Sequence, residues 1–188
     1  MRRATAIFLI FLLAFHAAHA SDAPNPFFGK YRRQFAFSLG QGVNSGFLIA
    51  APNRPVPFNM LHFQYSQPTT FFGFPARETI NAIQLIGWGR RYGWNWPAYS
   101  MPMAMLSEDI AFIHTKKWYF GSGFGAGFQA KQNERVGSKF LFGFKLFAGY
   151  QMWQRTNLEV FMQHFSNGNT GYSNNSYAFY GLGIAYNF

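Results

Sequence analysis

The sequence contains no cysteine, and only 12% of its 188 residues are charged. The lack of cysteine excludes a disulfide framework and a zinc site with thiolate ligands, although a chain without disulfides can still be exported. Long hydrophobic runs are also lacking. No apolar stretch beyond the N-terminal one approaches the roughly 20 residues that a membrane-spanning helix needs. A helical membrane protein is therefore excluded.

Aromatic residues are abundant instead, at 21% of the chain, and phenylalanine alone occurs 25 times. A disordered chain would be poor in such bulky apolar residues. The 19 glycines are interleaved with serine, asparagine and glutamine, a mixture that indicates β-strands separated by turns. The length fits one domain, or two at most.

The N-terminus has the pattern of a secretory signal. Two arginines precede an apolar segment of about ten residues, which is too short to cross a membrane. The triplet Ala18-His19-Ala20 that follows is typical of a cleavage site. We therefore expect a signal peptide over residues 1–20 and a mature chain over residues 21–188.

The mature chain is basic. Without Arg2 and Arg3 it keeps 14 lysines and arginines against 6 acidic residues. An exported protein has little access to nucleic acid, so we expect no nucleic-acid partner. A phosphorylated or anionic lipid surface is the more natural partner of this charge. A basic periplasmic domain with no specific partner is the alternative.

Apolar residues alternate with small or polar ones in segments of about ten residues. In one such segment Trp118, Phe120 and Phe128 share a face, and the other face carries glycines and Gln129. Gly, Asn, Pro and Ser clusters separate the segments. Eight candidate strands follow, of which the third and fourth show the weakest pattern: residues 34–42, 58–67, 79–88, 101–113, 118–130, 137–151, 155–166 and 176–188.

The bulky face of these segments is the apolar one, and the opposite face is small or polar. This pattern suits a small closed barrel, with lipid outside and a crowded polar interior. The last segment ends in Phe188, preceded at alternate positions by Tyr180, Leu182, Ile184 and Tyr186, and so resembles the C-terminal signature of bacterial outer-membrane barrels. We predict an all-β, eight-stranded antiparallel transmembrane β-barrel of the outer membrane, formed as a single domain by residues 21–188.

The mature chain contains three histidines. We expect His62 and His114 to be ordinary interior or interfacial residues. His164 differs, because strand parity puts it and Ser166 on the apolar, lipid-facing side of their strand, while Glu159 points the other way. Residues two apart along a strand are separated by about 6.6 Å, so the imidazole can reach the hydroxyl as a general base reaches a nucleophile.

The topology of the barrel places this pair. With an even number of strands and both termini in the periplasm, the seventh strand ends at the cell surface. His164 and Ser166 then lie in the outer leaflet, where a Gram-negative outer membrane holds lipopolysaccharide. A polar pair in the headgroup zone, without a catalytic role, is the alternative.

The segment His164-Phe165-Ser166-Asn167 resembles the His-x-Ser-Asn motif of the lipid A 3-O-deacylase (PagL) family, which consists of eight-stranded outer-membrane barrels. Weaker similarity covers much of the mature chain. The resemblance implies an esterase without metal or organic cofactor that removes the ester-linked 3-hydroxyacyl chain at position 3 of lipid A. It implies Ser166 as nucleophile and His164 as general base. Asn167 and the backbone N–H groups of Gly168 and Asn169 are candidates to stabilise the oxyanion.

The third member of the triad departs from the family pattern. The best-known form of the family orients its histidine with a glutamate on the eighth strand, and this chain has no acidic residue after Glu159. Alignment of the last strand puts Asn174 at that position, with Asn175 as the runner-up. An asparagine can fix the tautomer of the ring but stabilises an imidazolium less than a carboxylate does, so we expect slower turnover.

Two other functions stay open. A His-x-Ser-Asn-Gly motif with a triad asparagine also resembles outer-membrane phospholipase A, although those barrels have twelve strands. A non-catalytic structural barrel with a degenerate motif is the second alternative. Lipid A in the outer leaflet is the expected partner, and a homodimer is left open.

Overall fold

The structure is a computed structural model that describes residues 25–43, 58–91 and 94–188. For residues 88–91 and 94–99 it describes the backbone only. The signal peptide predicted over residues 1–20 lies outside these ranges. Within them, no helix has the length and apolar character that a membrane crossing requires.

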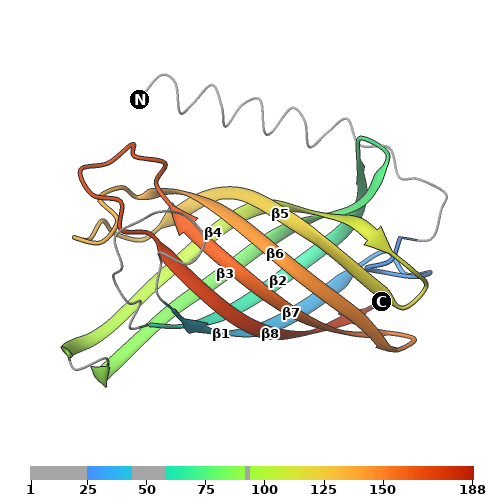
Figure 1. The fold of residues 1–188 in the computed structure, drawn as a ribbon, viewed down its shortest axis with the longest axis horizontal. Helices are drawn as coiled ribbons and strands as arrows, with labels where there is room; N and C mark the ends of the chain where they lie inside the picture. The colour runs from blue at the N-terminus through green and yellow to red at the C-terminus, as the bar shows by residue number, and fades with distance from the viewer. Residues whose placement is uncertain (1–24, 44–57, 92–93) are drawn as a thin grey trace.

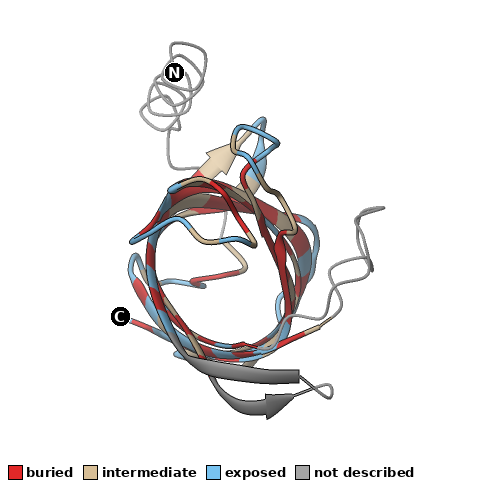
Figure 2. Ribbon diagram, turned by 90° about the vertical axis from the view of Figure 1, so that its left-hand side faces the viewer, coloured by how far each residue is buried: buried red, intermediate tan, exposed pale blue. Residues whose placement is uncertain are grey.

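Eight antiparallel strands form one closed barrel, in which each strand pairs with its neighbours in the sequence and β1 closes the ring on β8 (Figures 1 and 2). The predicted fold class is therefore confirmed. The strands are β1 (Gln34–Gly42), β2 (Asn59–Phe71), β3 (Phe74–Arg91), β4 (Trp94–His114), β5 (Trp118–Gln129), β6 (Phe140–Trp153), β7 (Thr156–Ser166) and β8 (Tyr177–Asn187).

Strands β2, β3 and β4 are longer than the sequence pattern predicted. The prediction ended the second strand at residue 67 and began the third at residue 79, because a proline inside a strand pattern usually marks its end. Here Pro68 pairs with Arg77 within the ladder, and a tight turn at Phe72 and Gly73, both with positive φ, joins the two strands. The β3–β4 hairpin extends likewise, so β4 begins at Trp94 instead of residue 101.

The interior of the barrel is polar at its centre. Arg77 and Lys145 each bind both Asp109 and Glu159, at distances between 2.7 and 3.1 Å from nitrogen to oxygen. These four buried groups carry no net charge together, as a low-dielectric interior requires. They join β3, β4, β6 and β7 across the lumen.

The outer wall is apolar. Phe35, Ile80 and Val160 have 58%, 60% and 51% of their surface exposed, and the exposed and buried residues alternate along the strands as in a membrane-spanning barrel (Figure 2). The β7–β8 loop lies at one end of the barrel, and the C-terminus lies at the other end with the β6–β7 turn (Figure 1).

Candidate active site

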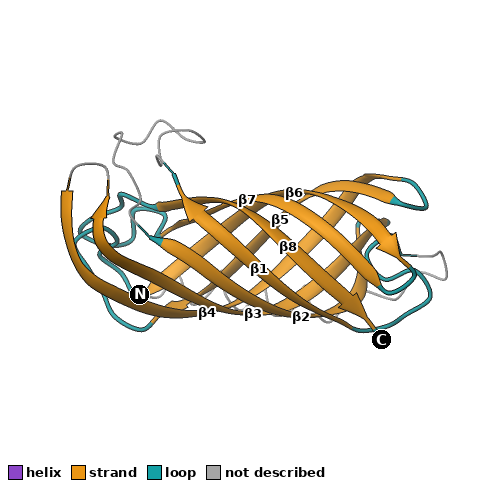
Figure 3. Ribbon diagram, turned by 90° about the horizontal axis from the view of Figure 1, so that it is seen from below, coloured by secondary structure: helices purple, strands orange, loops and turns teal. Residues whose placement is uncertain are grey.

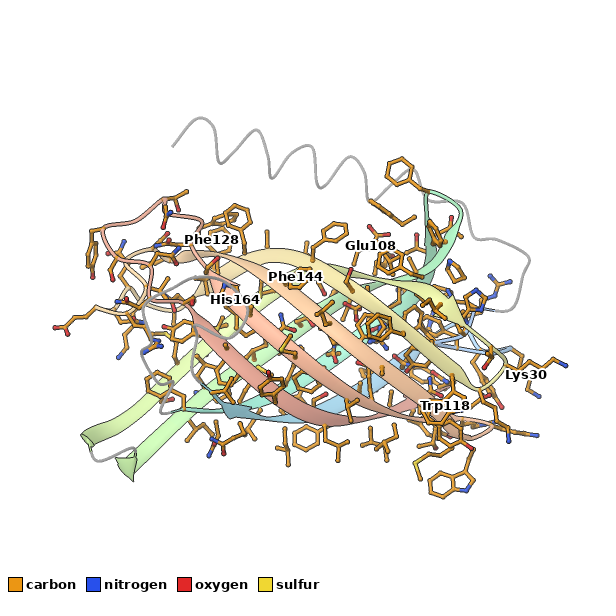
Figure 4. The ribbon with its side chains drawn as sticks, viewed as in Figure 1. Lys30, Glu108, Trp118, Phe128, Phe144 and His164 are labelled. Atoms are coloured by element: carbon orange, nitrogen blue, oxygen red, sulfur yellow. The ribbon has the colours of Figure 1, made fainter. Side chains whose placement is uncertain are left out.

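His164 and Ser166 lie on the outward-facing side of β7. They share the parity of the exposed Val160, whereas Glu159 is buried in the interior ion pairs. His164 begins the segment that ends at Asn167. It lies at the same end of the barrel as the β7–β8 loop, far from Lys30 and Trp118 (Figure 4). The two predicted site residues therefore occupy one face near one end of the barrel.

Neighbouring strands surround the imidazole with apolar groups. His164 lies opposite Phe144 of β6 and Ala178 of β8, and Ser166 lies opposite Phe142. Only 5% of the surface of His164 is exposed. Its Nδ1 atom is buried and has no hydrogen-bond partner among the described residues. The two predicted site residues thus share one face of β7, and among the described residues no hydrogen bond orients the imidazole ring.

A tight turn follows Ser166. The N–H of Thr170 donates to the carbonyl of Asn167 at 3.1 Å, and both central residues have positive φ, Gly168 at 58° and Asn169 at 60°. Glycine and asparagine tolerate this conformation best. The sequence Asn-Gly-Asn therefore turns the chain sharply directly after Ser166 and holds Gly168 against the ring of Phe142.

The turn already uses most of the predicted oxyanion donors. The N–H of Asn169 donates to Oδ1 of Asn167 at 2.9 Å, and Nδ2 of Asn167 donates to the carbonyl of Ser173 at 2.8 Å. The N–H of Asn167 donates to Oδ1 of Asn174 at 3.1 Å. The N–H of Gly168 has no recorded partner within the described part of the chain, so it is the donor that a ligand can use.

Asn174 lies in the β7–β8 loop beside this turn. Both ends of its amide are engaged, because Nδ2 donates to Oδ1 of Asn169 at 3.0 Å. Asn175 binds Ser173 and the carbonyl of Arg135. Neither asparagine has a recorded hydrogen bond to His164 among the described contacts, and the orienting role of Asn174 stays a prediction.

The loop between β5 and β6 is hydrogen-bonded to the β7–β8 loop beside the site, and the sequence analysis did not predict this contact. The N–H of Gly137 donates to the carbonyl of Ser173 at 2.8 Å, and Nε of Arg135 donates to the carbonyl of Ser176 at 2.7 Å. Ser176 has a φ of 42°, and its hydroxyl is buried without a partner among the described residues. No periodic pattern marks such loop contacts.

The other histidines lie apart from this site. His62 is buried in the interior, where its Nε2 atom lies 2.8 Å from Oδ1 of Asn81. His114 is exposed at the end of β4. Among the described residues, no three His, Cys, Asp or Glu side chains come together as a metal site.

Comparison with known proteins identifies the family. The model of the lipid A 3-O-deacylase (PagL) family matches residues 84–187, more than half of the chain and all of the site described above. The chain belongs to the lipid A 3-O-deacylase (PagL) family. Membership supports, in general terms, a hydrolase of lipid A in the outer membrane. No curated protein sequence matches the chain.

One solved structure supports the fold. The crystal structure of the outer membrane enzyme PagL is 13% identical with a TM-score of 0.55, and the match covers 82% of this chain and 99% of that one. The outer membrane protein Ail of Yersinia pestis is 12% identical with a TM-score of 0.49, covering 85% and 100%. The first likeness shows the same barrel architecture as in the PagL family.

Proposed function

We propose that the protein is an outer-membrane esterase that removes the ester-linked 3-hydroxyacyl chain from position 3 of lipid A, with Ser166 as nucleophile and His164 as general base. One observation carries this proposal: a histidine and a serine two residues apart share the outer wall of β7 in a chain of this family. Polar side chains on a lipid-facing wall cost free energy, and membrane proteins keep such residues mainly where they have a function.

The chemistry proceeds in two steps. His164 takes the proton of the Ser166 hydroxyl as Oγ attacks the ester carbonyl of the acyl chain. Collapse of the tetrahedral intermediate breaks the bond to the sugar oxygen, which leaves with the proton from His164. Water, activated by the same imidazole, then hydrolyses the acyl-serine and releases a 3-hydroxy fatty acid.

The oxyanion of the intermediate needs donors that are held in place beforehand. The N–H of Gly168 suits this role, because the turn fixes it two residues after Ser166 and leaves it without a partner in the described loop. The hydrogen bonds of Asn167 and Asn169 hold the turn. In this assignment the two asparagines position the donor instead of binding the oxygen themselves.

The surroundings suit an amphipathic lipid with anionic groups. Phe142 and Phe144 on β6 flank the pair and offer apolar surface to an acyl chain. Arg135 and Lys139, in the loop before β6, supply cations at the same end of the barrel for the phosphates of lipid A. The substrate would therefore reach the site laterally, from the outer leaflet.

Mass spectrometry of lipid A tests the proposal. We expect that expression of the full chain in a Gram-negative host removes one 3-hydroxyacyl mass from lipid A, and that Ser166→Ala and His164→Ala each abolish the change. Ser122→Ala and His114→Ala are matched controls, since Ser122 also faces outward on β5 and His114 is exposed. Both controls should retain activity.

The same experiment separates the alternatives. Release of fatty acid from phospholipid, with lipid A intact, would identify a phospholipase, and no change in either lipid would leave a structural barrel. The eight strands of the structure count against the twelve-stranded phospholipase architecture. Substitution of Asn174 tests whether it orients His164 or only holds the turn, and the mass of the purified protein tests whether the chain forms a homodimer.

A further inference from the structure

An apolar groove crosses the outer wall towards the other end of the barrel from His164 and Ser166. Its volume is about 610 Å³, and β8, β1 and β2 run side by side beneath it (Figure 3). Five aromatic rings and Ile184, on adjacent strands, form its walls in two rungs, Tyr186–Phe35–Tyr65 and Ile184–Phe37–Phe63. Ala82 of β3 lies beside Phe63 and leaves the groove open at that edge.

Arg155 lies at the end of this groove nearest the C-terminus, which the predicted topology places on the periplasmic side. It lies in the β6–β7 turn, directly before Thr156, which lines the groove opposite Tyr186. Its Nη1 atom donates to the hydroxyl of Tyr186 at 3.0 Å, and its Nε atom donates to the hydroxyl of Tyr31 at 3.1 Å. The ring of Tyr31 also lies 5.1 Å from the guanidinium carbon.

These contacts hold the guanidinium but do not neutralise it. A guanidinium has five N–H donors, and the two tyrosines accept from only two of them. Arg155 is exposed, so its remaining donors are accessible to a ligand. The O–H groups of the two tyrosines can donate to the same acceptor as the guanidinium.

The charge around this end of the groove is positive. Lys30, Arg32 and Arg33 are exposed beside Tyr31, and Nζ of Lys30 lies 5.6 Å from the centre of the Tyr31 ring. Among the acidic side chains of the described residues, Asp109 and Glu159 are inside the barrel and Glu134 is in a loop at the other end. Glu78 and Glu108 face each other on β3 and β4, and Glu78 lies two residues from Ile80, at the edge of the groove away from Arg155.

We propose that this groove binds an anionic glycerophospholipid of the periplasmic leaflet, with its phosphate on Arg155 and the two tyrosine hydroxyls and an acyl chain along the two aromatic rungs. Charge complementarity selects the ligand, since a phosphate diester accepts the hydrogen bonds that the guanidinium offers. The site is independent of Ser166, because it lies at the end of the barrel where the C-terminus is, and not at the end of the β7–β8 loop.

Lipid retention by the purified full-length protein tests this site. The protein is exchanged into micelles that contain equal amounts of ether-linked phosphatidylglycerol and ether-linked phosphatidylcholine, which no esterase can cleave. Native mass spectrometry then counts the lipids that stay bound. We expect phosphatidylglycerol to be retained about tenfold over phosphatidylcholine.

Matched variants distinguish the site from a general effect of basic charge. Arg155→Gln should remove most of this preference, whereas Lys117→Gln, which removes the same charge from the β4–β5 turn, should leave it unchanged. Ala82→Phe should fill the groove and reduce retention, while Ala148→Phe on the outer side of β6 should not. Equal retention of the two lipids, or equal effects of Arg155→Gln and Lys117→Gln, would overturn the proposal.

Discussion

At the scale of single residues, the unsatisfied imidazole of His164 stands out. Its Nδ1 atom is buried without a partner among the described residues, so nothing fixes its tautomer or stabilises its charged form. The residue directly opposite on β8 is Ala178, which is also buried and has outward parity. Side chains at directly opposite positions approach to roughly 5 Å at Cβ, so this position can present a carboxylate to the ring.

We therefore expect Ala178→Glu to raise the rate of lipid A deacylation by about tenfold or more, because a carboxylate on Nδ1 stabilises the imidazolium in the transition state. Ala178→Gln is the matched control, since it has the same shape without the charge and should give a much smaller gain. Both are measured as the fraction of lipid A that loses the acyl chain over time. A loss of activity in Ala178→Glu, with the barrel still folded, contradicts this assignment.

The same position separates two readings of the third triad member. If Asn174 orients His164, as the sequence predicted, Asn174→Ala should abolish activity, and Ala178→Glu should restore it. If Asn174 only holds the turn through the N–H of Asn167, the loss should be partial, and Ala178→Glu should act independently of it. The structure gives Asn174 contacts with the turn, so we expect the second result.

At the scale of elements, the turn after β7 fixes the backbone next to Ser166, the proposed nucleophile. Gly168 has a φ of 58°, and an added Cβ would lie 3.1 Å from the ring of Phe142. A left-handed backbone costs an alanine roughly 1 kcal/mol, and the contact with Phe142 adds to this. Gly168→Ala should therefore shift the N–H proposed for the oxyanion and reduce deacylation about tenfold, with little effect on folding.

Gly73→Ala provides the control for backbone strain. Gly73 has a φ of 84° in the β2–β3 turn, and an added Cβ there would meet nothing within 4 Å. The variant carries the same kind of strain at a distance from the site, so it should leave deacylation unchanged. The two initial rates on lipid A are compared at equal amounts of folded protein. Equal losses in both variants would mean that Gly168 has no specific role.

The strands also show which parts of the fold the alternation pattern of the sequence can predict. Alternation identified the strands and put Glu159 inside the barrel, because period-two patterns depend on local burial alone. It did not find the ends of β2 and β3, since Pro68 lies within the ladder and proline usually ends a strand. Partners far apart in the chain, such as Arg77 and Glu159, leave no local signal.

The candidate site was likewise predicted only in part from the sequence. Parity along β7 put His164 and Ser166 on the outer wall, because an unbroken strand keeps its alternation. Counting alternate residues from Phe188 back to Asn174 passes Ser176, which precedes β8 and has a positive φ. Beyond that residue the faces of the chain no longer follow from parity. The partners of the loop asparagines therefore required the structure.

At the scale of the whole molecule, the interior ion pairs determine how the barrel holds together. Arg77 and Lys145 share Asp109 and Glu159, so removal of one member leaves an uncompensated charge in the lumen. Breaking a buried pair in this way typically costs about 3–5 kcal/mol. The network links strands on different sides of the ring, and its loss should weaken the barrel as a unit.

Lys145→Met tests this expectation. The substitution removes one cation and leaves Asp109 and Glu159 with Arg77 alone, so the free energy of unfolding should fall by about 3–5 kcal/mol. Glu159→Gln in the same chain restores the balance of charge, and the double variant should recover much of the loss, which makes the two substitutions strongly non-additive. Urea unfolding in lipid vesicles, followed by tryptophan fluorescence, measures both quantities. Additive losses would mean that the four groups do not act as one network, and that aromatic packing around them, such as Phe27 and Phe147 on Arg77, stabilises the centre of the barrel instead.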